Sequence, residues 1–429
     1  MDAASSPVRT SEPVVPAPPA SFSETMDETF DARAEAEGLA FEPLPVQRNG
    51  NAVTWFGRTV RGANLSANLS AAQSQLLVDG MYRYGLLHLP DQTLTPEDEI
   101  RIATLFDHDP ESVVKGHPVK TVSRLPSPLN CVVLQGLGSV LDHHGIERRE
   151  LEPFPTAQHM WHTDSMAQLR CPPMLGFFYC LQAPFGDARA ADGRGATRFM
   201  CSQRVFDLMS DEDKELALRM RVKYTVTAAL SHAQEGRPLV PLRRPDADVR
   251  WPEHPNDVIQ VLAEAAPPKA PSEFTAQIDP ENPVHPLIQA HPITGKLCFL
   301  GMPGKLENLV EIQVQDDGST VELEWSKDDS NEFVARILRP CVRAEHIHAH
   351  TWSNRDCVLW DQRRLFHMNP PVEEYAPEPR VHHRIQLSCT AAMKPTGPVD
   401  RLCELAAATA GGGGSSSVAE ASATTAAKL

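Results

Sequence analysis

The most informative short motif in the chain is Trp161-His162-Thr163-Asp164. In an extended segment, residues two positions apart project to the same side, so His162 and Asp164 could bind one metal ion together. Taken alone the motif is weak evidence, because such pairs occur by chance in most long proteins and usually lie at the surface. A further neutral imidazole on another strand would strengthen it.

His367 is the candidate for that additional ligand. It follows Leu359-Trp360-Asp361-Gln362-Arg363, which has the pattern of a strand that runs into a polar loop. It precedes Arg380 and Arg384 on the next strand-like run. Two histidines and one carboxylate on one face of an octahedron are the usual ligands of Fe(II) in non-haem oxygenases. The two histidines and the aspartate are therefore candidates for a site of this kind.

Local sequence signals predict the elements that would position these residues. Ser70 with Gln73 forms a capping box, which predicts a helix that runs to about Tyr84. The segment 85–90 then has the pattern of a strand, and a second helix is expected over 95–106, where a threonine cap is followed by proline and acids. The predicted order at this end of the chain is helix, strand, helix.

The remaining signals favour a mainly β fold. Strand-like runs are expected at 174–181, 297–300, 357–361 and 381–387, with a helix near 330–338. Short strands separated by long irregular connections favour a double-sheet jelly roll over a parallel α/β sheet. The predicted fold class is mainly β with flanking helices (α+β), built on a double-stranded β-helix core.

Composition predicts one folded domain between two unstructured ends. Residues 1–45 are rich in proline, alanine, serine and acids, so a disordered arm is expected there. Residues 404–429 are dominated by small residues and include a run of four glycines, which is typical of a flexible tail. The folded domain is therefore expected over 46–403.

Charge and hydropathy limit the partners of the protein. The chain has 40 Lys and Arg against 56 Asp and Glu, a net charge of −16, which argues against binding nucleic acid or anionic lipid. No apolar run approaches the roughly 18 residues that a spanning helix needs. The nine cysteines are scattered, as expected for reduced thiols. A small-molecule substrate is the expected partner, and the sequence leaves a homo-oligomer open.

The two ends of the chain bear on its location. The first thirty residues are acidic and have no signal peptide or transit-peptide pattern, so an intracellular, cytoplasmic protein is expected. The last three residues, Ala427-Lys428-Leu429, are close to the Ser-Lys-Leu address for peroxisomal import. The peroxisome is therefore the alternative location.

An ordered set of motifs across the chain resembles the taurine dioxygenase (TauD/TfdA) family of iron(II)- and 2-oxoglutarate-dependent dioxygenases. The motifs are Gly85-Leu-Leu-His-Leu-Pro-Asp-Gln92, Leu94-Thr95-Pro96, Trp161-His-Thr-Asp164, Gly195-Ala-Thr197, His285-Pro286, His291-Pro-Ile-Thr-Gly295, Trp352, Trp360-Asp-Gln-Arg363, His367 and Arg380-Val-His-His-Arg384. They cover roughly residues 55–395. The resemblance implies an enzyme that uses Fe(II), 2-oxoglutarate and O2 to hydroxylate an sp3 carbon, with succinate and CO2 as co-products.

The resemblance also assigns the metal and cosubstrate residues. It makes His162, Asp164 and His367 the iron ligands, and it makes Arg380 and Thr197 the residues that hold the distal carboxylate of 2-oxoglutarate. An arginine suits that task because its planar guanidinium is always charged and pairs with a carboxylate through two hydrogen bonds. Without the upstream motifs, Arg380 would be interpreted as a surface ion-pair partner.

The residues expected to contact the substrate are Arg384 and Gln158. Arg384 lies four residues beyond Arg380, so both face the same side of one strand. In the family this position anchors an anionic substrate group, which implies a sulfonate, a carboxylate or a sulfate ester, although Arg384 could instead pair with a structural acid. Gln158 stands where relatives have a small polar residue, so the substrate is expected to differ from taurine.

Several other histidines have structural explanations. His346, His348 and His350 alternate along one predicted strand, yet they fall where the family has a variable strand, and we do not expect them to bind metal. His382 lies between the two arginines and is expected to be a hydrogen-bonded core histidine rather than a pocket residue. His159 is expected at the rim of the pocket or in a loop.

Two other functions remain open. The chain could be a non-catalytic jelly-roll protein that binds 2-oxoglutarate or iron. It could also be a hydroxylase of a quaternary amine, which would be expected to carry an N-terminal cysteine-rich zinc module and an aromatic cage. The first 130 residues contain no cysteine, which argues against the second function.

Overall fold

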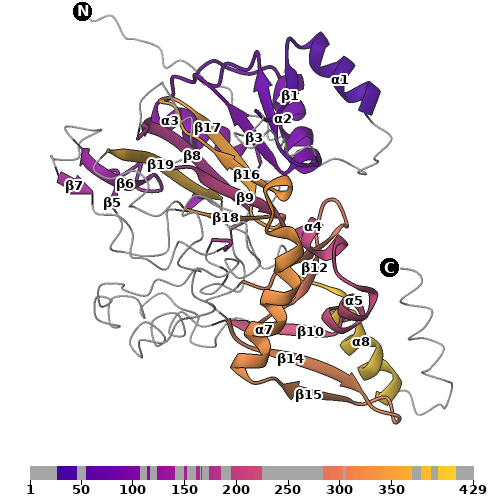
Figure 1. Cartoon of the computed structure of the whole chain (residues 1–429). Helices are drawn as coiled ribbons and strands as arrows, with labels where there is room; N and C mark the ends of the chain where they lie inside the picture. The colour runs from indigo at the N-terminus through magenta and orange to yellow at the C-terminus, as the bar shows by residue number, and fades with distance from the viewer. Residues whose placement is uncertain are drawn as a thin grey trace, which may run out of the picture.

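The computed structural model gives the fold as two lobes. It describes residues 27–45, 55–106, 114–115, 123–140, 149–151, 161–164, 166, 173–184, 195–224, 284–302, 306–369, 378–387 and 395–411. Figure 1 shows a large sheet with helices α1, α2 and α3 in the upper lobe. A smaller sheet with α5, α7 and α8 forms the lower lobe.

The upper lobe is built on a ten-stranded sheet. Its main path runs through β1 (Ala40–Pro43), β2 (Arg58–Arg61), β3 (Leu86–Leu89), β17 (Cys357–Asp361), β8 (Leu175–Gln182), β19 (Arg380–Leu387), β6 (Val133–Val140) and β5 (Ser123–Arg124). Two short strands complete it: β4 (Val114–Lys115) pairs with β19, and β7 (Arg149–Leu151) pairs with β6. All neighbours are antiparallel except β2 and β3.

A three-stranded sheet packs against the inner face of the large sheet. It has the order β16 (Ile347–His350), β9 (Thr197–Cys201) and β18 (Leu365–Met368). Side chains from the two sheets meet in one apolar cluster, where the rings of Phe199 on β9 and Trp360 on β17 lie 5.5 Å apart. Two facing, mainly antiparallel sheets with a shared core form the predicted jelly roll, so the expected fold class is confirmed.

Strand β8 shows how the large sheet is buried on both faces. Phe177 and Tyr179 belong to the apolar cluster under the helices, whereas Phe178 and Cys180 belong to the cluster between the two sheets. Successive side chains of a strand point to opposite faces, so an almost continuous apolar run lets one strand serve both layers.

The helices over the outer face begin and end where local sequence signals place them. They are α1 (Asp27–Ala36), α2 (Ala71–Tyr84) and α3 (Pro96–Thr104). The capping box of Ser70 with Gln73 is present, and α2 ends at Gly85, whose φ of 76° is the left-handed conformation that glycine adopts most easily. A second capping box starts α3 at Thr95. Both predicted helices and the strand between them are confirmed.

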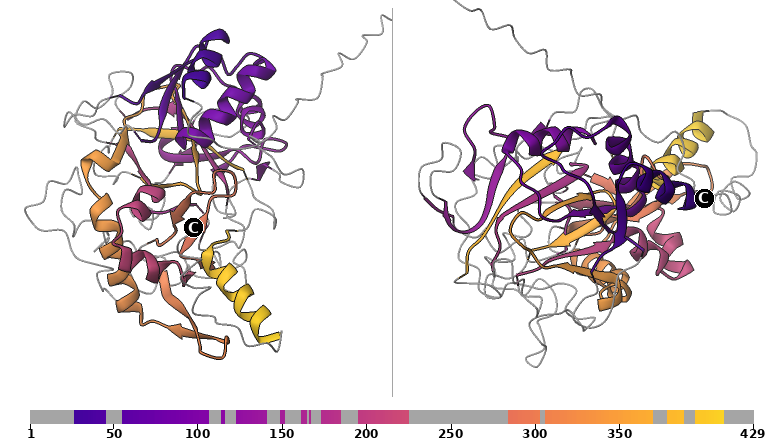
Figure 2. Two further views of the ribbon diagram at one scale, coloured as in Figure 1. Left: turned by 90° about the vertical axis from the view of Figure 1, so that its right-hand side faces the viewer. Right: turned by 90° about the horizontal axis from the view of Figure 1, so that it is seen from above.

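The lower lobe contains a four-stranded sheet between two helices. The strand order is β11 (Val284–Pro286), β10 (Met220–Tyr224), β14 (Leu306–Val314) and β15 (Thr320–Glu324). On β14, Leu309 packs with the side chains of α7 (Lys327–Leu338), while Val310 packs with those of α8 (Pro398–Gly411). Figure 2 shows these two helices on opposite sides of the sheet.

Shorter elements complete the two lobes. They are α4 (Ser202–Asp207), α5 (Asp211–Ala217), the hairpin of β12 (Ile288–Ala290) and β13 (Leu297–Phe299), and the 3₁₀ turns η7 (Arg339–Cys341) and η8 (Ala344–His346). The runs predicted as strands at 174–181, 297–300, 357–361 and 381–387 correspond to β8, β13, β17 and β19, and the helix predicted near 330–338 corresponds to α7.

Folded elements extend beyond both expected domain boundaries. In the segment expected to be a disordered arm, α1 contributes Phe30 and Ala34 to the core, and β1 pairs with β2. Because the segment is acidic overall, its composition did not indicate that Phe30 and Ala34 would be buried. At the other end, α8 runs across position 404, where the flexible tail was expected to begin, and anchors itself through Val399.

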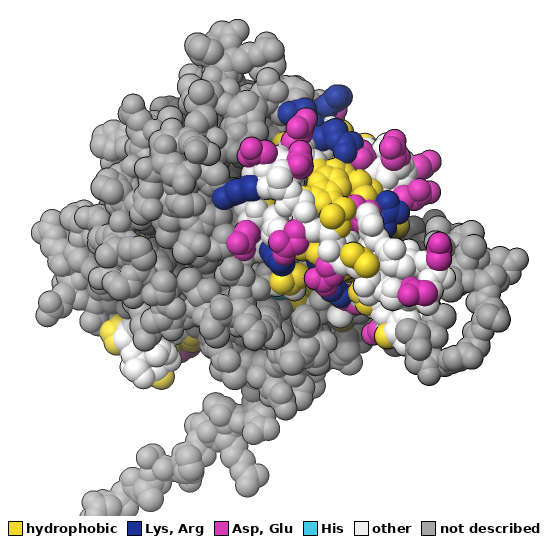
Figure 3. All heavy atoms as spheres, turned by 90° about the horizontal axis from the view of Figure 1, so that it is seen from below, with side chains coloured by type: hydrophobic (Ala, Val, Ile, Leu, Met, Phe, Trp, Pro, Cys, Tyr) yellow, Lys and Arg dark blue, Asp and Glu magenta, His cyan; other side chains and the backbone are white. Residues whose placement is uncertain are grey.

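The surface of the lower lobe carries the most exposed large apolar side chains of the described ranges. Val321 and Leu323 lie on the edge strand β15 and are about half exposed, and Leu405 lies on α8. Figure 3 shows apolar side chains on this lower face, bordered by acidic and basic ones. None of the helices in the described ranges has the length and hydropathy that a membrane crossing requires.

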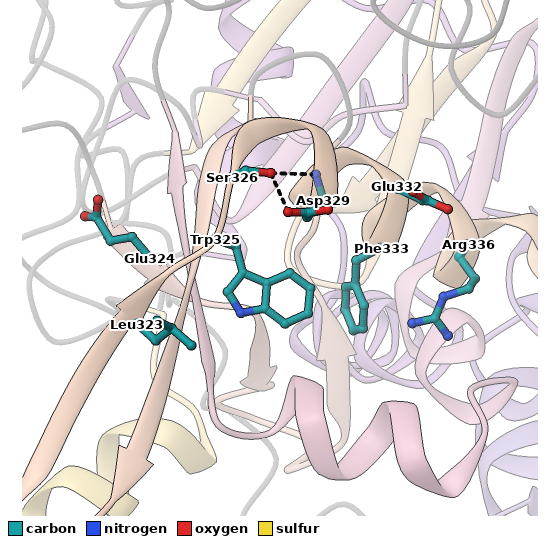
Figure 4. Close-up of a pocket in the computed structure, with 8 residues that line it drawn as sticks. All are labelled: Leu323, Glu324, Trp325, Ser326, Asp329, Glu332, Phe333 and Arg336. Carbon is teal, nitrogen blue, oxygen red and sulfur yellow. Dashed lines mark hydrogen bonds between the residues drawn. The ribbon is translucent and has the colours of Figure 1, made fainter.

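An open pocket lies on the same lobe, between β15 and α7. Figure 4 shows the rings of Trp325 and Phe333 along its wall, with centroids 5.6 Å apart. The dashed bonds in the figure join Ser326 and Asp329 at the N-terminal cap of α7. These bonds stabilise the start of a helix, and none of the histidines discussed above lines the pocket.

Candidate active site

Backbone pairing brings the two candidate histidine ligands together. The amide of His162 donates to the carbonyl of His367 at 3.0 Å, and the amide of His367 donates to the carbonyl of His162 at 2.8 Å. Directly opposed residues of an antiparallel pair project to the same face. This isolated bridge therefore extends the edge of the small sheet at β18 and places both imidazoles side by side, with ring centroids 4.2 Å apart.

Asp164 completes a compact group of metal-binding atoms. Its Oδ1 atom lies 3.7 Å from Nε2 of His367 and 3.9 Å from Nε2 of His162. The three residues are between 1% and 5% exposed. One ligand atom from each lies within 4.8 Å of the others, so the two imidazoles and the carboxylate can reach one metal ion together.

Gln362 fixes the orientation of the carboxylate. Its side-chain amide donates to Oδ2 of Asp164, and its carbonyl oxygen accepts from the backbone amide of Asp164 at 3.2 Å. Oδ1 therefore faces the two imidazoles. Groups that hold a metal-binding carboxylate in this way normally tune metal affinity, so Gln362 is a candidate functional residue that the sequence indicated only as part of a motif.

Asp164 is held in its charged form. Burial alone would raise the pKa of its carboxyl group, but the charges of Arg384, His367 and His162, together with the hydrogen bond from Gln362, outweigh burial. The pKa therefore lies well below its usual range. A carboxylate that is already ionised can bind a cation without first releasing a proton.

Arg384 points to the same carboxylate. Its Nη2 atom forms an ion pair with Oδ1 of Asp164, and its Nη1 atom donates to Oε1 of Gln135 at 3.1 Å. Arg384 is 3% exposed, so this positive charge lies inside the protein, next to the group of metal-binding atoms. The sequence placed Arg384 near the site, whereas nothing in the sequence pointed to Gln135.

Arg380 and Thr197 form a hydrogen-bonded pair between β19 and β9. Nη2 of Arg380 donates to the hydroxyl of Thr197 at 2.8 Å, and the indole nitrogen of Trp352 donates to the same hydroxyl at 3.0 Å. The three residues come from β19, from β9 and from the segment after β16, and all are buried. A buried guanidinium beside a hydroxyl is a suitable arrangement for binding a carboxylate.

His382 lies between the two arginines on the inner face of β19 and is fully buried. Its ring packs against Trp352, with centroids 4.4 Å apart, and against Phe178 at 5.5 Å. Neither ring nitrogen has a hydrogen-bond partner among the described residues. His382 therefore does not have the hydrogen bonds expected of a core histidine.

Two other predicted positions, Gln158 and His159, fall outside the described residues. Of the two residues expected to contact the substrate, the structure therefore describes Arg384 alone.

The motif residues His291 and Asp361 have a structural role. Nε2 of His291 lies 2.8 Å from a carboxylate oxygen of Asp361, and the guanidinium of Arg363 pairs with both oxygens of that carboxylate at 3.0 Å. Nδ1 of His291 accepts from the amides of Ile293 and Thr294, which closes the following turn. This network fixes the strand end that carries Gln362.

The three alternating histidines do not form one metal site. The ring of His346 lies 4.6 Å from that of Trp55, because His346 belongs to a 3₁₀ turn rather than to strand β16. His350 points into the interior, where it meets His88 and Asp356 in a second group of metal-binding atoms. The expectation that these histidines do not bind metal stays a prediction for His346 and His348, whereas His350 belongs to a group that could hold a metal ion and that its sequence neighbours did not reveal.

Comparisons with known proteins agree with this geometry. The family model described as "Taurine catabolism dioxygenase TauD, TfdA family" matches residues 41–386. A xanthine dioxygenase of Schizosaccharomyces pombe, the alpha-ketoglutarate-dependent enzyme xan1, is 25% identical over 425 residues, which cover 90% of this chain and 96% of that protein. The xanthine dioxygenase xanA of Emericella nidulans is 23% identical over 359 residues, with 73% and 87% covered.

Solved structures share the fold. A taurine dioxygenase from Burkholderia xenovorans aligns with a TM-score of 0.54 at 15% identity, covering 87% of this chain and 99% of that one. At this identity the likeness concerns the fold alone. The family match covers most of the chain, includes every motif listed above, and agrees with the buried group of two histidines and an aspartate. The chain belongs to the TauD/TfdA family and is a 2-oxoglutarate-dependent dioxygenase.

Proposed function

We propose that the protein is an Fe(II)- and 2-oxoglutarate-dependent hydroxylase whose first candidate substrate is xanthine. The observation that carries the proposal is the buried group of His162, Asp164 and His367 beside a second buried site, Arg380 with Thr197. The first can bind the metal, and the second can bind the distal carboxylate of 2-oxoglutarate.

The donor atoms fit Fe(II). Two neutral imidazoles and one ionised carboxylate are the usual ligands of Fe(II) in oxygenases of this type, and they leave positions for other ligands. When bound, the iron would supply the activation of O2 that is coupled to the conversion of 2-oxoglutarate to succinate and CO2. Gln362 would keep Oδ1 of Asp164 directed at the metal.

Arg384 supports a substrate with acidic character. Its guanidinium is buried and pairs with the same carboxylate oxygen that faces both imidazoles. A cation bound at that oxygen would compete with this ion pair and leave the guanidinium available to an anion. Xanthine is a weakly acidic heterocycle with two carbonyl oxygens, so it can accept hydrogen bonds from an arginine in both its neutral and anionic forms.

The xanthine proposal changes one expectation from the sequence. Hydroxylation at an sp3 carbon of a sulfonate, carboxylate or sulfate ester was expected, whereas the carbon of xanthine that could be hydroxylated belongs to an unsaturated ring. Xanthine is preferred because two relatives named for this substrate match the chain over most of their length. A small sulfonate or carboxylate is the second candidate, because Arg384 would suit either anion.

Xanthine-dependent succinate formation tests the proposal. The purified protein with Fe(II), ascorbate, O2 and 2-oxoglutarate should form succinate in proportion to xanthine consumed, and the H162A and D164A variants should form none. Turnover of a sulfonate or carboxylate without turnover of xanthine would support the second candidate. Full turnover by either variant would contradict the proposed ligands.

The two alternative functions, a non-catalytic protein that binds 2-oxoglutarate or iron and a hydroxylase of a quaternary amine, predict different results. A non-catalytic protein would bind 2-oxoglutarate without releasing succinate with any substrate. A quaternary amine is disfavoured by the buried Arg384, since its positive charge would repel a cationic substrate near the metal site.

A further inference from the structure

A second group of two histidines and one aspartate lies in the interior of the protein. His88 comes from β3, His350 from β16, and Asp356 from the residue before β17. Their side chains are 1% to 2% exposed. One ligand atom from each lies within 4.8 Å of the others, as in the candidate active site. The group therefore joins the two facing sheets at a point that solvent does not reach.

The distances within this group resemble those between two ligands of one metal ion. Nε2 of His88 lies 3.3 Å from Oδ1 of Asp356, and Nε2 of His350 lies 3.4 Å from Oδ2. Both exceed the roughly 2.9–3.0 Å that is most common for N–H···O hydrogen bonds. Two ligands bound tetrahedrally at about 2.0–2.1 Å from zinc are separated by about 3.3–3.4 Å.

Other contacts orient the three side chains. Nδ1 of His88 lies 3.2 Å from the hydroxyl of Thr59, which leaves Nε2 facing the carboxylate. The amide of Ser353 donates to Oδ2 of Asp356 at 2.8 Å. Metal-binding histidines and carboxylates normally have such partners, because these fix the ring orientation and the tautomer.

The charge balance favours a cation. A buried carboxylate is costly unless positive charge or several hydrogen bonds compensate it. The side chain of Asp356 is 1% exposed, and two imidazole nitrogens face its carboxylate oxygens. A cation bound between them would compensate the buried negative charge.

We propose that His88, His350 and Asp356 bind a second metal ion, a divalent ion of the zinc type with a structural role. Two imidazole nitrogens and a carboxylate oxygen of Asp356 provide three donor atoms of the types that zinc binds, in a buried site, and a water molecule would complete the tetrahedron. The proposal is independent of the substrate and of the catalytic metal, because none of the three residues belongs to the candidate active site.

The side chain of Trp352 links the second site to Thr197, one of the residues proposed to bind 2-oxoglutarate. The ring of Trp352 lies 4.5 Å from that of His350, and its indole nitrogen donates to the hydroxyl of Thr197. A metal ion on His350 would therefore hold Trp352, and through it Thr197, in place. Loss of this ion should weaken 2-oxoglutarate binding by a few-fold while leaving the catalytic ligands intact.

Metal counting on the full-length protein tests the proposal. After chelation, reloading with Zn(II) and desalting, elemental analysis should find two equivalents in the wild-type protein and one in H162A/H367A. Adding D356N to this double variant should remove the remaining equivalent, while the introduced amide oxygen can still accept from the backbone amide of Ser353. No retained zinc in H162A/H367A, or one retained equivalent after D356N is added, would overturn the proposal.

Cobalt spectroscopy provides a test that does not need D356N to fold. Co(II) in H162A/H367A should give the intense visible absorption of a tetrahedral site at one equivalent, and Zn(II) should displace it. Zn(II) should also raise the melting temperature of H162A/H367A by several degrees, because a ligand that binds only the folded state stabilises it. The absence of the tetrahedral spectrum would contradict the second site.

Discussion

The protein contains two buried groups with the same donor atoms and different surroundings. At His162, Asp164 and His367 a guanidinium pairs with the carboxylate, and a second guanidinium lies on the neighbouring wall. At His88, His350 and Asp356 the contacts are a threonine hydroxyl, a backbone amide and an indole ring. The two groups therefore differ in the positive charge next to their donors, and we expect this charge to suit the first group to anionic ligands.

The two groups also differ in how the fold builds them. His162 and His367 are opposed on two short segments at the edge of the small sheet, next to the inner face of β19 that carries both arginines. The second group lies between strands β3, β16 and β17 and is closed on all sides that the structure describes. We therefore expect exchangeable ligands at the first group and a fixed ion at the second.

The largest expected difference between the two groups is in turnover. H162A and H367A should reduce succinate formation to background, a loss of about 10³-fold or more, because each removes a ligand of the catalytic metal. H350L should retain turnover within about tenfold. Rates of succinate release at saturating 2-oxoglutarate measure both. If a folded H350L variant lost turnover, the two groups would not differ in their contribution to catalysis, contrary to the proposal.

A third buried carboxylate, that of Asp361, can be compared with the two candidate metal sites. Its partners are two side chains of the protein, Arg363 and His291. D361N should destabilise the fold by about 3–5 kcal/mol, because it leaves the buried guanidinium of Arg363 without its ion-pair partner. Chemical denaturation at pH 7 measures the loss, with metal-loaded wild-type protein as the control. A loss below about 1 kcal/mol would show that Arg363 finds another partner.

The same carboxylate predicts a dependence on pH. Burial would raise the pKa of Asp361, but the charge of Arg363 and the contacts with His291 outweigh burial and hold the pKa far below its usual range. A carboxyl group whose pKa is lowered by folding stabilises the protein above its unfolded pKa of about 3.9, and this contribution is lost as the pH falls. Between pH 6 and 3, wild-type stability should therefore fall more steeply than that of D361N. Parallel curves would contradict this assignment.

Arg380 should contribute the next largest effect. A hydrogen bond to a charged group contributes about 1.5–3 kcal/mol, so R380A should raise the KM for 2-oxoglutarate by about 10- to 150-fold. R380K should recover only part of this loss, because lysine lacks the paired donors. Iron affinity should be unchanged in both variants. Equal KM values in wild type and R380A would place the cosubstrate elsewhere.

Gln362 should have a smaller effect, confined to the metal. Q362L removes both contacts that orient Asp164, and loss of such contacts typically lowers metal affinity by 10- to 100-fold. We expect Q362L to lower the affinity for Fe(II) by about tenfold, the lower end of this range, because the three ligands themselves remain. Fe(II) titration under anaerobic conditions measures it, and the zinc content of H162A/H367A serves as a control that Q362L should not change.

The smallest expected effect concerns His382. H382L removes two ring nitrogens that have no hydrogen-bond partner in the described part of the chain, and the leucine fills a similar volume. If a bound ligand provides their partner, the KM for 2-oxoglutarate or for the substrate should rise by a few-fold, with little loss of stability. A clear gain of stability with unchanged KM values would mark His382 as a destabilising core residue without a ligand contact.

Local signals in the sequence were sufficient for the elements next to the site. The capping residues Ser70 and Thr95 define the ends of α2 and α3, since each satisfies backbone amides through its own side chain. The short apolar runs of β8 and β17 likewise indicated buried strands. The order of the motifs then indicated the jelly roll and the family.

Contacts between distant residues could not be predicted in this way. Asp356 lies 268 residues from His88 along the chain, and no local pattern links them. The pairing of Gln135 with Arg384 depends on β6 lying next to β19, which sequence spacing does not show. The helix α1 was missed because its few apolar side chains are embedded in a highly acidic segment.

Anaerobic absorption spectroscopy tests the central claim most directly. Fe(II) and 2-oxoglutarate together should give the visible charge-transfer band of a metal-bound 2-oxo acid in the wild-type protein. At saturating 2-oxoglutarate the band should be absent in H162A/H367A and retained in H350L, and xanthine should shift it. A band that persists in H162A/H367A would show that the catalytic iron does not lie at His162, Asp164 and His367.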